Sequence, residues 1–396
     1  MTLDGTRYAR IEDVDALPAF FMTVVSDSDV WLFAGSNGPF TAGRGHADQA
    51  MFPYQTADKI MRDVNSSGAR TAMLVTRADS TELWEPWQGS GPSTDVRRNL
   101  YKRVDGTGLR FEEVHERLGL RFRWELSGCE RYGLVRHAAI EELTHEPVEI
   151  SYLDGFQQII PPGVDQELYM RSSYLAKGYM RHERDADLGL ALYTLNTRIT
   201  DRPEPAESLR AAVAWSVGHA DAQILIDERA IERFRHRQPL PGADEIRGRF
   251  GAYLASGTVR LEGGAATDWY TVIDTGLDHR AVLELRAALR EADALRADLE
   301  ASVRADQQGL VDRVAAADGV QTGADEAATA NHFANVLYNI MRGGTFEYGY
   351  EVPSADLGSY LRDQRPAVYE RHRAWLASLP PFMPLEALHT KAAETD

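Results

Sequence analysis

The chain has 396 residues, of which 43% are hydrophobic and 26% are charged, and its formal net charge is −17. A length of this order predicts two or three domains with enough chain to bury a substantial core. The acidic excess argues against nucleic acid and anionic membranes as partners, because both require a basic protein surface.

Cysteine usage and the first residues bear on the cellular compartment. Cys129 is the single cysteine, so an internal disulfide and a thiolate-rich metal site are excluded. Acidic residues at 4, 12, 13 and 15 interrupt the first twenty positions, where a secretory leader would be apolar. Apolar runs stay below the ~18 residues that a bilayer-spanning helix needs. These features predict a soluble, cytoplasmic protein without a membrane partner.

The first hundred residues favour short strands. Two β-rich runs, Phe20–Val25 and Val30–Ala34, are separated by four small polar residues and predict a hairpin. Asn37-Gly38 adds a strong tight-turn signal, and Thr71–Thr76 is another predicted strand.

Residues 99–143 form the predicted centre of the fold. Apolar and polar side chains alternate over 120–126, which is the period of a strand with one dry face and one wet face. Turn signals at Asp105–Gly108, Leu118-Gly119 and Ser127-Gly128 divide this region. Such spacing predicts an antiparallel meander that packs against a second sheet.

Further strands follow, together with one helix. Val148–Leu153 alternates and is expected to end at Asp154-Gly155, and Gln166–Tyr179 has the composition of a helix. The remaining predicted strands of the sandwich are Leu188–Ile199, Leu209–Val217, Ala222–Ile226 and Trp269–Ile273.

The last quarter of the chain changes to helical patterning. Apolar residues at steps of three and four predict one long amphipathic helix over Asp278–Ala317, with a narrow seam from Val282 to Val303 laid on a partner. A second helix is expected over Asp325–Arg342, and a third is capped by Asp356. The predicted fold class is α+β: a large antiparallel β super-sandwich over 1–275, followed by a helical linker or docking segment over 276–396.

Motifs for common cofactors are missing from the sequence. Neither a phosphate-binding glycine loop nor a dinucleotide fingerprint occurs, and His145-Glu146 lacks the second histidine of a zinc motif. We therefore expect no cofactor and no metal. Cys129 follows a glycine and could approach a histidine in space, but a buried inert thiol is the favoured alternative.

Adjacent carboxylates are the first candidates for catalysis. Hydrolysis of a glycosidic bond needs two carboxyl groups that face each other across the sugar. Adjacent residues of a strand point to opposite faces, and a chain with 60 acidic residues has such pairs by chance. The adjacent pairs are Glu112/Glu113 and Glu141/Glu142, and the pairs two residues apart are Asp27/Asp29 and Asp185/Asp187.

Aromatic and charged residues in predicted loops are the candidates for ligand binding. Trp84 and Trp87 flank Glu85, and indole faces stack on sugar rings while carboxylates bind hydroxyl groups. The alternative is that both tryptophans close the edge of the sandwich. Arg44 lies next to a glycine in a predicted loop, where the alternative is an ordinary salt bridge, and Tyr54 completes the predicted set.

Several segments carry a resemblance to a known family. In the predicted sandwich they are Ser36–Arg44, Met51–Ile60, Asn99–Lys102, Gly108–Glu112 and Glu130–Arg136. In the helical part they are Asn335–Gly344 and Arg371–Leu379. Together these segments resemble the N-terminal region of cellobiose-phosphorylase-like proteins of glycoside hydrolase family 94.

The resemblance implies an N-terminal super-sandwich, a helical linker and an (α/α)6 barrel that holds the catalytic aspartate and the phosphate site. This chain is expected to end after the linker, so no catalytic residue is assigned. It would then be a non-catalytic module that supports such a barrel, in the same chain or in another, and could contact the oligosaccharide. A self-sufficient enzyme with a carboxylate pair in the sandwich cleft, a purely structural partner and a homodimer stay open as alternatives.

Overall fold

The computed structural model describes residues 1–396 except 4, 63, 65–66, 79, 89–93, 201–206, 220, 344–350 and 395–396. The sequence also predicts a loop at Gly89–Ser93 and a break between two strands at 201–205, and both lie outside the described residues. Met1–Gln307 and Gln308–Asp396 form two compact units. The first unit contains nearly all of the described strands, and the second is mainly helical.

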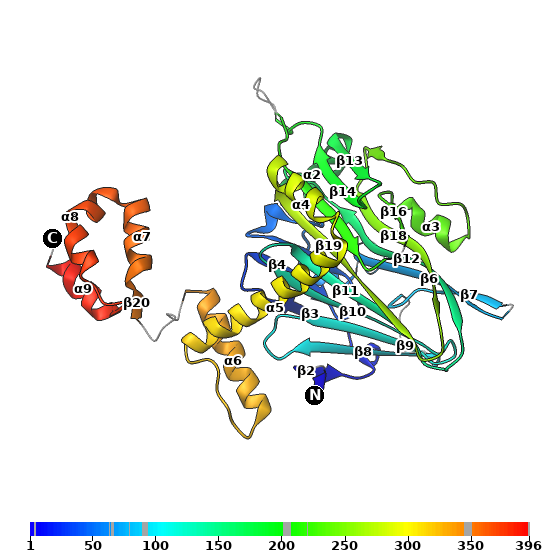
Figure 1. Ribbon diagram of the computed structural model, residues 1–396, viewed down its shortest axis with the longest axis horizontal. Coiled ribbons are helices and arrows are strands. Elements are labelled where there is room, and N and C mark those ends of the chain that lie inside the picture. The colour runs from blue at the N-terminus through cyan, green and yellow to red at the C-terminus, as the bar shows by residue number, and fades with distance from the viewer. Residues whose placement is uncertain are drawn as a thin grey trace. The chain divides into compact units, whose positions relative to one another are not determined.

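An antiparallel sheet of eleven strands dominates the first unit. Strands β8 to β11 form the predicted meander and lie side by side in Figure 1. From one edge to the other, the order is β1 (Thr2–Leu3), β2 (Thr6–Ile11), β8 (Val96–Arg103), β9 (Leu109–His115), β10 (Leu120–Cys129), β11 (Gly133–Glu142), β19 (Ala266–Leu277), β15 (Ala211–Val217), β14 (Leu190–Leu195), β13 (Met180–Asp185) and β17 (Glu245–Arg247).

Two smaller sheets share the main core with the large one. The five-stranded sheet has the order β16 (Gln223–Leu225), β18 (Gly251–Leu261), β12 (Val148–Ile159), β6 (Gly68–Arg77) and β7 (Ser80–Trp84). The three-stranded sheet is β3 (Phe21–Val24), β4 (Val30–Gly35) and β5 (Phe40–Arg44). One apolar cluster contains side chains of all three sheets, so the predicted sandwich is confirmed. The short helices of this unit are α1 (Ala57–Ile60), α2 (Gln166–Tyr179) and α3 (Arg229–Arg235).

The alternation over 120–126 is confirmed. The four apolar side chains of this stretch are buried in the main core, and Phe111 of β9 stacks on Trp124 with ring centroids 4.9 Å apart. Arg121, Arg123 and Glu125 lie on the opposite face of the sheet, because successive side chains of a strand alternate.

A charged cluster joins the eleven-stranded sheet to the five-stranded sheet in the middle of the core. The Arg136 guanidinium of β11 donates to both carboxylate oxygens of Asp154 in β12, at 2.5 and 2.9 Å, and neither side chain is exposed. Trp269 Nε1 of β19 donates to the same carboxylate at 2.7 Å, and Thr71 Oγ1 of β6 donates at 2.5 Å. Four strands are thereby tied by one buried carboxylate.

Two predicted corners are wrong, because the strands run through them. β10 continues through Ser127-Gly128, where a Cβ on Gly128 would come within 3.0 Å of Val30, so this glycine permits close packing of the two sheets. β12 continues through Asp154-Gly155, because Asp154 is held by Arg136 and a Cβ on Gly155 would lie 1.9 Å from the Tyr253 carbonyl oxygen.

The predicted single helix over Asp278–Ala317 is also wrong. The structure has two helices, α4 (His279–Ala288) and α5 (Ala292–Ala316), as Figure 1 shows. A straight helix over this stretch would extend about 60 Å and could not follow a twisted sheet. The break lies between two apolar pairs that both pack on this sheet, Leu285 with Leu289 and Leu295 with Leu299. The partner of the seam is therefore the sandwich itself.

Polar contacts fix α5 to the first unit. Asp306 accepts hydrogen bonds from Ser26 Oγ and the Asp27 amide at 3.0 Å, and burial raises the pKa of its carboxyl group. Asp298 accepts from the Tyr132 hydroxyl and the Arg131 guanidinium. The linker helix thus begins as part of the sandwich.

The second unit contains helices with little burial. Its elements are α6 (Glu326–Met341), β20 (Glu351–Pro353), α7 (Ser354–Gln364), α8 (Pro366–Ala377), β21 (Phe382–Pro384) and α9 (Leu385–Ala393). The helix expected over Asp325–Arg342 is present as α6, with Asp325 as its cap. The N-cap of α7 is Pro353, so the expected cap at Asp356 is wrong. Pro366 lies in the first turn of α8, where its missing N–H has no cost. None of the helices within the described residues has the length and apolar composition that crossing a bilayer requires.

Candidate functional site

The two tryptophans of the predicted ligand set lie in the core. Trp84 and Trp87 are 4% and 5% exposed, and Trp87 packs edge-on against Phe111 and Trp124. Glu113 of β9 joins them, since it accepts from Trp84 Nε1 at 2.7 Å and from the Trp87 amide at 2.6 Å. Neither indole therefore presents a face to a sugar, and the packing alternative describes their positions.

The other three predicted residues have structural partners of their own. Glu85 accepts from Arg70 at 2.9 Å and from Arg235 at 2.8 Å, which ties β6 to α3. Tyr54 packs edge-on against Trp31 and Phe33 of β4.

Arg44 ends β5 in an ion-pair cluster. It binds Asp274 of β19 through Nε at 2.6 Å and Asp29 through Nη1 at 2.6 Å, and it donates to the Glu130 carbonyl. Burial raises the pKa of Asp274 despite this contact. Among the described residues, no hydrogen bond or ion pair joins Arg44 or Tyr54 to the tryptophans. Ligand binding by the five residues stays a prediction.

The carboxylate pairs of the central sheet are structural. Glu113 also pairs with Arg98 at 2.8 Å, while Glu112 on the other face accepts from Asn99 and Tyr101. The two groups therefore do not face each other across a space for substrate.

Glu142 illustrates why such a carboxylate does not act as a general acid. Hydrogen bonds from Thr144, Arg77 and the Gly264 amide lower its pKa in spite of burial. A general acid must hold its proton near neutral pH, so a raised pKa is required instead.

Cys129 lies in the core, which is the position that the favoured alternative predicted. Cys129 is buried, and burial raises the pKa of its thiol to about 11, so the thiolate is scarce at neutral pH. Within the described ranges, no three His, Cys, Asp or Glu residues are grouped as metal ligands would be.

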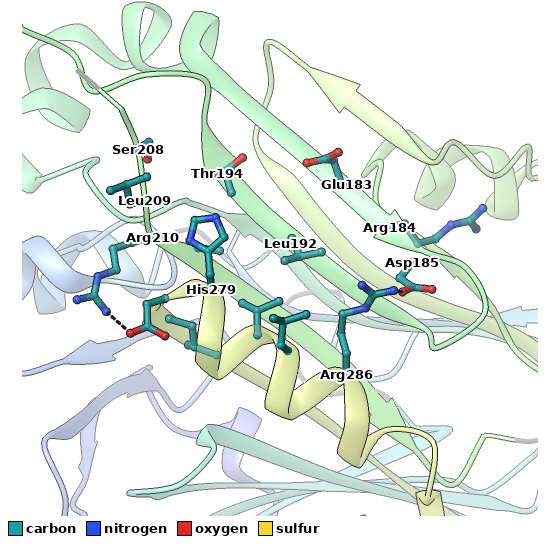
Figure 2. A pocket seen from close by; sticks show the side chains of 15 residues that line it. Glu183, Arg184, Asp185, Leu192, Thr194, Ser208, Leu209, Arg210, His279 and Arg286 are labelled. Carbon is teal, nitrogen blue, oxygen red and sulfur yellow. Dashed lines mark hydrogen bonds and ion pairs between the residues drawn. The ribbon is translucent and has the colours of Figure 1, made fainter. Parts of the chain in front are cut away.

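A cleft of about 580 Å³ lies between the large sheet and α4. Figure 2 shows its lining: β13 and β14 on one side, α4 on the other, and residues before β15 at one end. The apolar part consists of Leu192, Leu209, Ala211, Leu277, Val282 and Leu283. Leu209 and Leu283 are 59% and 61% exposed, so the mouth of the cleft is apolar.

Ion pairs border the cleft at both ends. Asp185 of β13 pairs with Arg286 of α4 at 2.6 Å. Arg210 lies 3.8 Å from Asp278 and donates to the Gly276 carbonyl, and Figure 2 marks the contact with Asp278. Asp278 also caps α4 by accepting from the Ala281 amide. These contacts leave exposed leucines between matched charges.

The lining indicates the class of occupant. Among the described residues, the lining of the cleft contains no Trp, Tyr or Phe, so these residues offer no aromatic ring of that kind for sugar stacking. Exposed leucines between ion pairs are instead typical of a protein contact. Leu209, His279 and Leu283 were not predicted as functional from the sequence. Leu283 is an apolar residue outside the apolar seam of α4, and this position could have indicated an exposed contact residue.

Comparisons with known proteins give distant structural similarity only. No family model matches the chain, and no curated protein matches it. A bacterial glucoamylase complexed with acarbose has a TM-score of 0.42 at 12% identity, covering 96% of this chain and 55% of that chain. A protein described as a kojibiose phosphorylase from the human microbiome has a TM-score of 0.40 at 10% identity, covering 81% and 35%.

A polysaccharide lyase is similar over a shorter part, with a TM-score of 0.31 at 13% identity and coverage of 65% and 32%. The chain therefore spans about half the length of the glucoamylase and about a third of the other two.

Proposed function

We propose that the chain is a non-catalytic super-sandwich module of a glycoside-phosphorylase-like enzyme, and that its C-terminal helices dock on a helical catalytic domain. The observation that carries the proposal is that α7, α8 and α9 bury none of their side chains. Of residues 351–394, all of which are described, Met383 alone is buried. Helices with this little burial need another surface to be stable.

The apolar residues of these helices are exposed. Tyr360 of α7 is 60% exposed, Val368 of α8 is 37% exposed, and Phe382 of β21 is 41% exposed. Exposed apolar side chains that recur on neighbouring elements mark a protein contact. A helical partner fits them best, because the apolar face of one helix packs readily against another. The resemblance to family 94 supplies the identity of this partner, an (α/α)6 barrel.

The sandwich supports the non-catalytic part of the proposal. Glu112 and Glu113 are held in fixed positions by hydrogen bonds, and hydrogen bonds lower the pKa of Glu142 in spite of its burial. The cleft of Figure 2 offers a second protein contact through Leu209 and Leu283. We therefore assign the sandwich a supporting role and place the chemistry in the partner.

Two other functions compete with this one. A self-sufficient enzyme would take its catalytic pair from the three acids of the cleft, Glu183, Asp185 and Asp278. A purely structural partner would use the exposed helices to form a homodimer.

Activity of the chain alone tests the first alternative. The full chain is incubated with inorganic phosphate and a panel of disaccharides that includes cellobiose and kojibiose, and sugar phosphate and free sugar are measured. We expect no turnover above buffer. Sustained turnover that Asp185→Asn abolishes, while Asp244→Asn leaves it unchanged, would establish the self-sufficient enzyme and overturn the proposal.

Hydrogen exchange and light scattering test the docking role. In the isolated chain, amides of α7–α9 should exchange far faster than those of β10 and β11, because helices without buried contacts open easily. Size-exclusion chromatography with light scattering should give a monomer. A dimer with protected α7–α9 would favour the homodimer, and a protected monomer would contradict docking altogether.

A further inference from the structure

A second cavity lies on the face of the large sheet that points away from the main core. This hollow has a volume of about 240 Å³ and extends over β9, β10, β11 and β19. The register places Ala139 of β11 between Arg123 of β10 and Asp268 of β19. Because Ala139 has only a methyl group, the longer side chains around it leave an open space above it.

Most of the charges in the walls are already paired. Arg110 binds Glu125 at 2.8 Å, which also accepts from the Tyr8 hydroxyl. His137 Nε2 lies 2.7 Å from Asp268 Oδ2, and its ring stacks on Tyr270 with centroids 4.3 Å apart.

Arg296 of α5 holds one wall residue of the hollow, Asp268 of β19, from outside the lining. It donates to Asp268 at 2.5 Å and lies over the Tyr270 ring. The contact with His137 lowers the pKa of Asp268, so this carboxylate is ionised. Carboxylates and the imidazole therefore form a fixed set of hydrogen-bonding groups around the hollow.

Arg123 differs from the other cations of the hollow. In the part of the chain that the structure describes, it makes no ion pair or hydrogen bond. Its other cross-strand neighbour is Glu112, whose oxygens accept from Asn99 and Tyr101 and lie 3.7 Å from Arg121. The half-buried guanidinium of Arg123 is thus left with two free edges for a planar oxyanion.

We propose that this hollow binds a monosaccharide-sized, hydroxylated anion, with its carboxylate or phosphate on Arg123. Glu125 and Asp268 accept hydrogen bonds from the hydroxyl groups, and His137 provides a further polar contact. The volume corresponds to about eight water molecules at ~30 Å³ each, which suits one sugar ring but not a longer chain. A sugar acid and a sugar phosphate share this chemistry.

Isothermal titration calorimetry on the full chain tests the site. Glucuronate and glucose 1-phosphate are the probes, and glucose and inorganic phosphate are titrated for comparison. We expect saturable binding of at least one sugar anion, with glucose weaker by about tenfold or more, because it lacks the charged contact. Binding of glucuronate alone identifies a carboxylate ligand, and binding of glucose 1-phosphate alone identifies a phosphate ligand.

Two variants and one control localise the binding. Arg123→Gln should weaken it by about tenfold or more, and Ala139→Leu should abolish it by filling the hollow. Arg97→Gln removes the same charge on neighbouring β8, where the side chain is 56% exposed and paired with Glu116, and should bind as the unchanged chain does. Thermal unfolding shows that each variant is folded.

The proposal is overturned if neither sugar anion binds saturably, if inorganic phosphate binds as tightly as both, or if Arg123→Gln and Ala139→Leu leave the affinity unchanged. All residues that line the hollow belong to the sandwich. If the sugar anions do not bind, the proposed docking of the C-terminal helices is unaffected. If the helices do not dock, the proposed binding site is unaffected.

Discussion

The sandwich and the C-terminal helices are stabilised in opposite ways. The core of the sandwich contains large side chains from three sheets and a fully buried Arg136–Asp154 pair. Residues 351–394 bury a single side chain, Met383. A buried ion is tolerated only beside its counter-ion, so the strands that carry Arg136 and Asp154 must keep their relative positions. The C-terminal helices contain no buried ion pair among the described residues, and their stability depends on the surface that covers them.

The largest expected effect concerns the buried pair. Asp154→Asn leaves the Arg136 guanidinium without a counter-charge, and we expect the free energy of unfolding to fall by about 3–5 kcal/mol. Urea denaturation followed by circular dichroism measures the change. Asp244→Asn is the matched control, because Asp244 is 77% exposed and its pair with Arg184 should contribute only about 0–1 kcal/mol. A loss below about 1 kcal/mol for Asp154→Asn would contradict the contrast between the two regions.

Acid should destabilise the sandwich through a buried histidine. Burial lowers the pKa of His182 to about 4, so the unfolded chain, with a pKa near 6.5, binds more protons between these values. The contribution of His182 to stability is therefore fully present above about pH 6.5 and is lost as the pH decreases toward 4, with a loss of about 2 kcal/mol between pH 7 and pH 5.

Urea titrations at pH 7 and pH 5 measure this loss. His182→Gln should remove about 2 kcal/mol of the difference between the two values, since glutamine does not titrate in this range. His46→Gln, at a side chain that is 62% exposed, should leave the difference unchanged. An equal pH dependence in all three proteins would show that His182 is not the cause.

A smaller effect is expected at the helix cap of α6. Asp325 accepts hydrogen bonds from the Ala327 and Ala328 amides, and Asp325→Ala should destabilise the helix by about 1 kcal/mol. Hydrogen exchange of α6 amides should accelerate, while that of β10 stays the same. Asp356→Ala offers the comparison, because Asp356 lies inside the first turn of α7 rather than at its cap. Slower or unchanged exchange in Asp325→Ala would argue against the cap.

The smallest effect is expected on the exposed face of α7. Tyr360→Ser removes a ring that is 60% exposed, so the free energy of unfolding of the sandwich should change by less than about 0.5 kcal/mol. Tyr193→Ser, at a fully buried ring of β14, should cost several times more. If both substitutions lowered the free energy of unfolding equally in urea denaturation, the ring of Tyr360 would be buried by a contact that forms in solution.

Local patterns in the sequence predicted most of the elements. The alternation over 120–126 predicted β10 and its buried face, Asn37-Gly38 predicted the β4–β5 turn, and Asp325 predicted the start of α6. These signals succeed because hydrophobic period, turn chemistry and capping act between residues close in the chain.

Long-range packing decided the rest. The order of strand patterns before helix patterns was enough to predict the α+β class, but it was not enough to place the functional residues. Whether Asp154-Gly155 ends a strand depended on Arg136 from another sheet, and whether Trp84 faces a ligand depended on Glu113 of β9. The cleft likewise exists only where β13, β14 and α4 meet, and the hollow only where β9, β10, β11 and β19 lie side by side. A side chain's burial is set by partners that chain position does not reveal, so only the tertiary structure could place these sites.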